Sequence, residues 1–199
     1  KICKMIAEAN SRGIVKIEIN DPLKRIKKIE DEFCRRFGLR NVKVVPTPSF
    51  GTTDIKTLLG KAASELIRGH LRNGDIIGIS GGVTLYEVTR HFEPINLQDI
   101  TVVPLMGGNS EIEESTHGPE IARTIAEKAH GRLVNVPAPV LVQDASVHEV
   151  FVSNNMIKRG LEIARNCSIA IVGIGAVKEG ATFFRRNYLC LEELDFLRS

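Results

Sequence analysis

The chain has 199 residues, of which 43% are hydrophobic, 26% charged and 5% aromatic, and its formal net charge is +3. This size and composition are typical of one globular domain with a small appendage, and they exclude a mini-protein scaffold that needs disulfides or a metal for its core. The cysteines are far apart and lack zinc-like spacing, so we expect reduced, mostly buried thiols and no metal site. They are Cys3, Cys34, Cys167 and Cys190.

The distribution of apolar and charged residues bears on location and partners. The longest nearly unbroken apolar stretch, residues 169–177, is about half as long as a membrane-spanning helix, and the N-terminus lacks a signal-peptide apolar region, so we expect a cytoplasmic protein. Residues 1–43 contain 12 Lys and Arg against 6 Asp and Glu, whereas the remaining residues carry a net negative charge. This asymmetry predicts that the leading segment lies near a polyanion, with solvated helix faces as the alternative.

The leading segment contains two predicted helices and a predicted strand. Apolar residues recur at helical spacing over residues 2–9, and Gly13 ends this helix. Alternation over residues 14–19 predicts a short strand, after which Asn20-Asp21-Pro22 starts a helix that runs to about Phe37. The apolar stripe of this helix suits a linker helix or an oligomer seam, with core packing as the alternative. It consists of Leu23, Ile26, Ile29, Phe33 and Phe37.

From Asn41 onward, short β-branched runs alternate with amphipathic helical stretches. The predicted strands are Val42–Val45, Ile76–Ser80, Thr101–Leu105, Leu133–Val136 and Ile169–Gly173. The predicted helices are Asp54–Leu71, Val83–Arg90, Pro119–Ala129 and Asn155–Asn166, and a last helix begins near Leu191. Strands that are apolar on both faces and alternate with helices are typical of a parallel sheet covered on both sides. We therefore predict a doubly wound, mostly parallel α/β domain over residues 41–199.

In such sheets, ligands bind where strands end and helices begin. The first loop of this kind, Ser80-Gly81-Gly82-Val83-Thr84, follows a predicted strand and opens a predicted helix. Consecutive glycines allow a tight turn, and the N–H groups and hydroxyls lie at the positive end of the helix, which favours a phosphate. A plain Gly-Gly turn is the alternative.

Other loops at strand ends supply further candidate residues. The loops Met106-Gly107-Gly108 and Gly173–Lys178 each follow a strand, so all three glycine loops can line one pocket, although a glycine pair also permits tight packing. Gln143 and Asp144 suit sugar hydroxyls, with helix capping as the alternative for Asp144. His117 lies in a turn-like stretch, and we expect a solvent-facing loop histidine there, with a pocket residue as the alternative.

The candidate residues in these loops do not form a recognisable set of catalytic residues. Ser80, His117 and Asp144 do not support a catalytic triad, because nothing in the sequence pairs these three residues with one another. We therefore predict no catalytic residue and no cofactor.

The order of the motifs GDIIGISGGVTLYEV, VVPLMGGN, ARTIAEKAHG, VPAPVLV and IAIVGIG resembles the SorC-type sugar-binding domain of DeoR-like bacterial transcriptional regulators, over about residues 14–199. The resemblance implies a fold similar to the sugar-phosphate isomerase/CoA-transferase-like fold, and a phosphorylated sugar effector that is sensed and not converted. It implies that residues 1–40 are the incomplete end of a helix-turn-helix DNA-binding unit with a linker helix. Residues 41–199 are then an effector-binding domain truncated at its C-terminus, in a protein that binds operator DNA as a dimer or tetramer.

The resemblance also implies roles for individual residues. In the family, the loop at Gly81–Thr84 cradles the phosphate, and polar residues with the other glycine loops flank the sugar. Met106 stands where bisphosphate-binding members can have Arg, which disfavours a second phosphate, and Gly81 stands where many members have Trp. Lys178 is the substitute for a basic contact that the family supplies further along. The candidate effector-binding set is Ser80, Gly81, Gly82, Val83, Thr84, Met106, Gly107, Gly108, His117, Gln143, Asp144, Gly173, Gly175 and Lys178.

Two other classes of function stay open. A sugar-phosphate isomerase-like enzyme of related fold would use similar loops, but it needs a general base that the sequence does not identify. A bare oligomerisation module would leave the three glycine loops unexplained.

Overall fold

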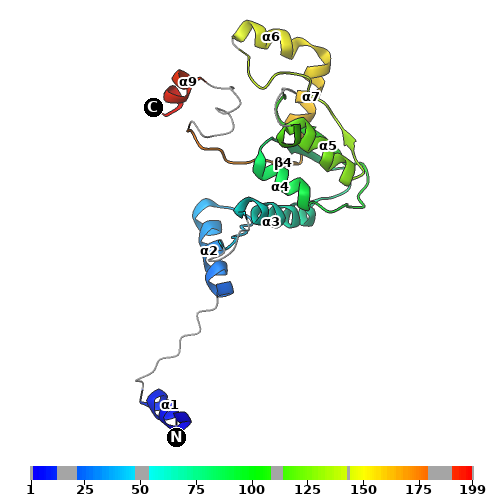
Figure 1. Ribbon diagram of the computed structural model, residues 1–199. Coiled ribbons are helices and arrows are strands. Elements are labelled where there is room, and N and C mark those ends of the chain that lie inside the picture. The colour runs from blue at the N-terminus through cyan, green and yellow to red at the C-terminus, as the bar shows by residue number, and fades with distance from the viewer. Residues whose placement is uncertain are drawn as a thin grey trace. The chain divides into compact units, whose positions relative to one another are not determined.

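The computed structural model describes residues 2–12, 22–47, 54–108, 114–142, 144–178 and 190–198. These residues belong to two compact units, residues 1–47 and 48–199 (Figure 1). Within the described ranges, no helix is both long and apolar enough to cross a membrane.

The first unit contains the helices α1 (Ile2–Ser11) and α2 (Pro22–Phe37), which confirm the two helices predicted there. Pro22 is the first residue of α2, where its missing N–H would be unpaired in any case. The rings of Phe33 and Phe37, on one face of α2, lie 5.5 Å apart between centroids, and the guanidinium of Arg36 lies 5.5 Å from the Phe37 centroid.

The strand predicted at Val42–Val45 is wrong, because residues 41–47 form no regular element. The N–H of Val44 donates to the carboxylate of Glu30 on α2 at 2.9 Å. This backbone group is therefore satisfied by a side chain of the same unit and not by a neighbouring strand. The strand predicted at residues 14–19 lies outside the described residues.

The second unit is built on four parallel strands, which confirms the predicted doubly wound α/β fold. They are β1 (Ile76–Ile79), β2 (Thr101–Pro104), β3 (Arg132–Leu133) and β4 (Ile169–Ile171), in the order β3-β2-β1-β4. The chain adds β2 and β3 on one side of β1 and then returns to place β4 on its other side, with Ile77 between Val102 and Ile169. The strand order reverses beside β1, and in open α/β sheets this reversal marks the ligand crevice.

The helices of the second unit agree with the prediction within a few residues, with one addition. They are α3 (Ile55–His70), α4 (Val83–His91), α5 (Gly118–Lys128), α6 (Ala145–Ser153), α7 (Asn155–Arg165) and α9 (Leu191–Arg198), with the short 3₁₀ helix η1 (Glu114–Thr116) before α5. Helix α6 was not predicted, because it is rich in β-branched residues and buries none of its side chains. Periodicity reports a buried face, so a helix without one gives no such signal.

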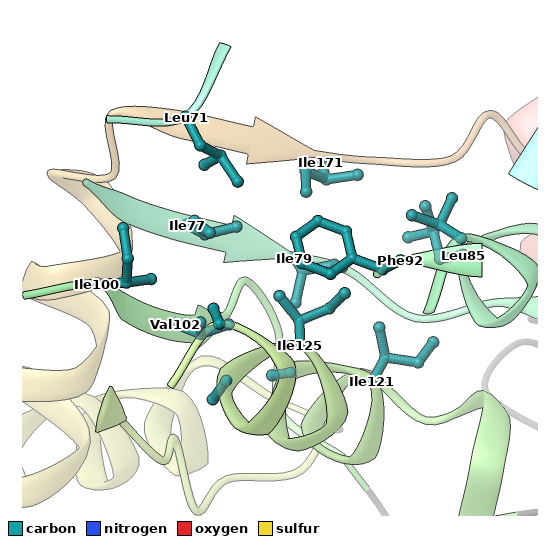
Figure 2. Packing of buried hydrophobic residues seen from close by; sticks show 14 residues of the cluster. Leu71, Ile77, Ile79, Leu85, Phe92, Ile100, Val102, Ile121, Ile125 and Ile171 are labelled. Atoms are coloured by element: carbon teal, nitrogen blue, oxygen red, sulfur yellow. The ribbon is translucent and has the colours of Figure 1, made fainter. Parts of the chain in front are cut away.

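The two faces of the sheet are covered by different helices. One hydrophobic cluster joins Ile77, Ile79 and Val102 to side chains of α4 and α5, as Figure 2 shows for Ile121 and Ile125. Alternate strand residues point the other way, where a second cluster joins Val103 of β2 to α7 and its surroundings. Because neighbouring strand residues face opposite sides, both faces of β1 and β2 are buried.

Thiols are less buried than expected. The side chains of Cys34 and Cys167 are half-buried and that of Cys190 is exposed, so the prediction of mostly buried thiols is wrong for Cys190. Among the residues that the structure describes, no group of three His, Cys, Asp or Glu side chains could hold a metal ion.

Helix α3 lies against α4 through a small-residue contact. A Cβ atom at Gly60 would lie 2.6 Å from the backbone carbon of Glu87, so only glycine permits this approach. The hydroxyl of Ser64 donates to the carbonyl of His91 at 3.0 Å, and that of Thr57 donates to the Glu87 carboxylate at 3.2 Å. Close backbone approach thus fixes α4, whose first residues form the candidate site.

We expect Gly60→Ala to lower the free energy of unfolding by about 1–3 kcal/mol, because the added methyl group must separate α3 from α4. The matched control is Gly69→Ala on the same helix, where a Cβ atom would meet no heavy atom within 4 Å. That change should raise the free energy of unfolding by up to about 1 kcal/mol, since alanine favours a helix over glycine. Urea denaturation measures both, and equal effects would contradict the proposed contact.

Candidate ligand-binding site

The loop that joins β1 to α4 is held at two points. The N–H of Ser80 donates to the carbonyl of Ile171 on β4 at 3.0 Å, and the N–H of Gly82 donates to the carbonyl of Thr116 at 2.9 Å. The first bond ties the loop to the neighbouring strand, and the second ties it to the end of η1. The N–H of Gly82 is therefore used inside the protein and is not available to a ligand.

Gly82 is the N-cap residue of α4. Its φ of 130° lies in a region that residues with side chains rarely adopt, and a Cβ atom there would meet no heavy atom within 4 Å. The N–H groups of Val83, Thr84 and Leu85 have no acceptor within the helix, as in the first turn of any α-helix. Among the described residues, these donors at the start of α4 have no partner, and they lie at the positive end of the helix dipole beside the open space at Gly82.

Ser80 and Thr84 add two hydroxyl groups to this end of the helix. Both side chains are half-buried, and neither hydroxyl forms a hydrogen bond with another residue in the described part of the chain. Backbone N–H groups and hydroxyls at a helix N-terminus are the donors that bind phosphate in many proteins. The predicted phosphate loop thus has the donors that the hypothesis requires, although the N–H of Gly82 is not among them.

The loop after β2 packs against two other loops through its glycines. A Cβ atom at Gly107 would lie 1.9 Å from the carbonyl oxygen of Ala138, and the N–H of Gly108 donates to that oxygen at 3.1 Å. A Cβ atom at Gly108 would lie 2.7 Å from Cγ of Pro119, in the first turn of α5. A Cβ atom at Gly81 would lie 3.0 Å from the first backbone nitrogen of α5. The first two glycine loops therefore meet at the start of α5. Gly81, Gly107 and Gly108 are needed for close packing, as the alternative interpretation of these glycines predicted.

His117 is buried, which contradicts the expectation of a solvent-facing histidine. Its side chain is only 6% exposed, although the residue directly precedes α5 and is its N-cap. Its ring lies near the second glycine loop, because Nδ1 is 3.8 Å from where a Cβ atom of Gly108 would be. Burial here results from two loops that are distant in the sequence, and no local pattern could reveal it.

The other candidate residues are less closely connected to the first loop. Met106 is half-buried, and its Cγ lies 3.8 Å from where a Cβ atom of Gly118 would be. Gly173, Gly175 and Lys178 are exposed, and neither glycine is needed for close packing. Gln143 lies outside the described residues.

Asp144 serves as the N-cap of α6. Its carboxylate accepts hydrogen bonds from the hydroxyl of Ser146 at 2.6 Å and from the N–H of Val147 at 3.0 Å. These two bonds, the Ser146 hydroxyl first, hold the pKa of Asp144 below its usual value. The capping alternative for this exposed residue is therefore confirmed.

Comparison with known proteins gives a consistent set of relatives. The family model described as "Putative sugar-binding domain" matches residues 21–199. The chain is 26% identical over 197 residues to the "Deoxyribonucleoside regulator" of Bacillus subtilis, covering 99% of this chain and 63% of the relative. It is 26% identical over 192 residues to the "Transcriptional regulator LsrR" of Klebsiella pneumoniae, covering 95% of this chain and 56% of the relative. The chain thus spans about three-fifths of the length of these curated relatives.

Solved structures agree with this relationship. A DeoR family transcriptional regulator from Listeria monocytogenes is similar with a TM-score of 0.78 and 25% identity, covering 87% of this chain and 68% of that chain. The full-length sorbitol operon regulator SorC from Klebsiella pneumoniae has a TM-score of 0.78 at 22% identity, covering 99% of this chain and 65% of that chain. At that identity, the likeness to SorC shows the shared fold.

We expect Gly107→Ala to lower the free energy of unfolding by about 1–3 kcal/mol, because its methyl group would overlap the carbonyl of Ala138. Gly175→Ala is the control, since a Cβ atom there meets no heavy atom within 4 Å. Its effect should stay within about 0.5 kcal/mol. Thermal denaturation compares the two, and a Gly107→Ala protein as stable as the control would show that the two loops do not touch.

Proposed function

The chain belongs to the sugar-binding domain family of SorC/DeoR-type bacterial transcriptional regulators, and we propose that it binds a phosphorylated sugar whose occupancy modulates DNA binding. The regulated genes, on this proposal, form a carbohydrate-metabolism operon. The single observation that carries the proposal is the start of α4, where the first-turn N–H groups and the hydroxyls of Ser80 and Thr84 have no partner among the described residues and Gly82 borders open space.

A phosphate group fits this helix end for electrostatic reasons. The N–H groups of residues 83–85 and the hydroxyls of Ser80 and Thr84 are hydrogen-bond donors, and a phosphate dianion offers only acceptors. The positive end of the helix dipole adds an attraction that a neutral sugar lacks. The phosphate therefore lies at Gly82–Thr84, with Gly82 keeping the approach open by its lack of a side chain.

The rest of the ligand, on this proposal, extends toward the start of α5. Met106 places an apolar thioether there and not a cation, which supports a ligand with one phosphate. The remaining proposed sugar-facing residues are Gly107, Gly108, His117, Gln143, Asp144, Gly173, Gly175 and Lys178. Asp144 also caps α6. A sugar hydroxyl would therefore have to donate to a carboxylate that already accepts two hydrogen bonds.

Sensing, and not turnover, is the activity that we propose for this site. The relatives named above are regulators of transcription. The Bacillus protein is named for deoxyribonucleosides, and the Klebsiella structure is that of a sorbitol operon regulator. Suitable probes are therefore 2-deoxyribose 5-phosphate and sorbitol 6-phosphate, each compared with its unphosphorylated sugar. Conversion of a phosphosugar that has both a carbonyl and a hydroxyl on the adjacent carbon, such as ribose 5-phosphate, would favour the isomerase-like enzyme over the sensor.

We expect Thr84→Ala to weaken binding of the phosphorylated probe that binds the full-length protein by about 10- to 150-fold. The reason is the loss of one charge-assisted hydrogen bond, which contributes about 1.5–3 kcal/mol. Binding of the unphosphorylated sugar should hardly change. Gly82→Val should lower both affinity and stability, because a β-branched residue opposes a φ of 130°. Titration calorimetry measures the affinities.

Thr124→Ala is the matched control for Thr84→Ala. The hydroxyl of Thr124 donates to the carbonyl of Glu120 at 3.0 Å inside α5, so its removal should leave phosphosugar affinity unchanged. If Thr84→Ala kept the affinity within about twofold while the fold stayed intact, the start of α4 would not hold the phosphate.

A second expected outcome concerns operator DNA and oligomeric state. We expect residues 1–199 alone to bind DNA from upstream of their own gene weakly, with a Kd above about 1 μM at physiological salt. Basic residues near the N-terminus can contact phosphates, but reading bases requires a complete helix-turn-helix unit. A protein that carries the proposed complete unit should bind the same DNA at least 100-fold more tightly, as a dimer or tetramer. Fluorescence anisotropy and sedimentation test this; tight specific binding by residues 1–199, or a monomeric complete protein, would contradict it.

A further inference from the structure

His117 is a buried histidine whose ring nitrogen Nε2 has no hydrogen-bond partner among the described residues. Only the Nε atom of Arg68 shares this condition within the described part of the chain, and the guanidinium of Arg68 is anchored by a 2.8 Å bond to Glu93. In either tautomer, Nε2 is a donor or an acceptor, so the described residues leave one polar function of His117 unsatisfied. Buried polar groups of this kind are rare in folded proteins and call for a specific partner.

The local structure gives His117 no compensating task. It is the N-cap residue of α5, yet its side chain makes no capping hydrogen bond, whereas Ser, Thr, Asp or Asn would. Only its backbone carbonyl takes part, accepting the N–H of Ile121 at 2.9 Å. The imidazole is therefore unfavourable both as a helix cap and as a core residue.

His117 lies near both of the first two glycine loops. The preceding carbonyl, that of Thr116, accepts the N–H of Gly82 at 2.9 Å, so the backbone of His117 lies beside the proposed phosphate loop. Its ring lies beside Gly108 of the second glycine loop. His117 thus stands between the two loops that meet at the start of α5.

A neutral oxygen suits this position better than a second phosphate. The first turn of α5 contains Pro119, which has no N–H to donate, and Glu120. Hydrogen bonding from Arg123 holds the pKa of Glu120 below its usual value, so this carboxylate is ionised near neutral pH. The Glu120 carboxylate is already paired with Arg123, and Pro119 removes one of the first-turn N–H groups that a second phosphate would use, whereas a sugar hydroxyl or ring oxygen needs only one partner.

We propose that His117 is a specificity-determining residue, whose Nε2 forms a hydrogen bond with an oxygen of the sugar while the phosphate lies at the start of α4. This inference rests on the proposed function and adds the residue that distinguishes a phosphosugar from phosphate alone. Ligand binding supplies the partner that Nε2 lacks among the described residues, so the free energy that the unsatisfied nitrogen costs the ligand-free protein is recovered in part as ligand affinity.

Three substitutions in the full-length protein test this role. His117→Leu should weaken binding of the phosphorylated probe about 10-fold, while the Tm of the ligand-free protein rises by about 2–4 °C because the unsatisfied group is gone. His117→Gln carries an amide nitrogen near the position of Nε2 and should keep the affinity within about threefold. His117→Asn reaches only the position of Nδ1, so it should bind as weakly as His117→Leu while it improves the cap of α5.

Inorganic phosphate is the probe that separates this inference from the function on which it rests. Its affinity should fall in Thr84→Ala and stay unchanged in His117→Leu, because phosphate alone has no sugar oxygen to reach His117. Titration calorimetry with phosphate and with the phosphosugar gives both comparisons.

The results distinguish the role of His117 from the proposed binding of a phosphosugar. If phosphosugar affinity depends on Thr84 but is unchanged in His117→Leu, the role of His117 is overturned and the proposed function stands. If no phosphosugar of the panel binds the wild-type protein, both are overturned. If His117→Leu does not fold, the amide variants decide, and equally weak binding by His117→Gln and His117→Asn overturns the role of His117.

Discussion

Burial of both faces of β1 and β2 is the constraint on which the second unit depends. A strand that is apolar on both sides must be covered by helices on both sides, and parallel strands need a crossover between each pair. The crossovers place α4 and α5 against the cluster that contains Ile77 and Ile79, and α7 against the opposite cluster. Every strand then ends at the same edge of the sheet, so loops that are far apart in the sequence converge there. The candidate site is a consequence of this arrangement.

The glycines at this edge serve two different physical purposes. Gly81, Gly107 and Gly108 are small because other backbone or proline atoms occupy the space where their side chains would be. Gly82 has open space beside it and is required for its φ of 130°. Packing glycines bring the loops together, and the conformational glycine leaves the start of α4 accessible. The Gly-Gly pair at positions 81 and 82 therefore contains one residue of each kind.

Groups that are left uncommitted give the site its capacity to bind. The hydroxyls of Ser80 and Thr84, the first-turn N–H groups of α4 and Nε2 of His117 have no partner in the described chain. Elsewhere the same kinds of group are satisfied: Asp144 and Asn154 cap α6 and α7, and Ser64 and Thr57 bond across the α3–α4 contact. A folded protein tolerates unsatisfied donors where a ligand completes them, at some cost to the stability of the ligand-free state.

The sequence by itself determined the order of the elements of the second unit, because strands buried on both faces and helices with one buried face leave periodic patterns. It also determined that glycine loops follow β1 and β2, since two consecutive glycines are visible without any structure. It could not reveal α6, which buries no face, or the fate of residues 42–45, where Glu30 satisfies a backbone group that a strand would have paired. For Asp144 the sequence left a sugar contact and a helix cap open, and the local hydrogen bonds from Ser146 and Val147 decide for the cap. Only the tertiary structure decided that His117 is buried and that Gly81, Gly107 and Gly108 pack against other loops. These last outcomes depend on contacts between residues distant in the chain, and such contacts leave no local pattern in the sequence.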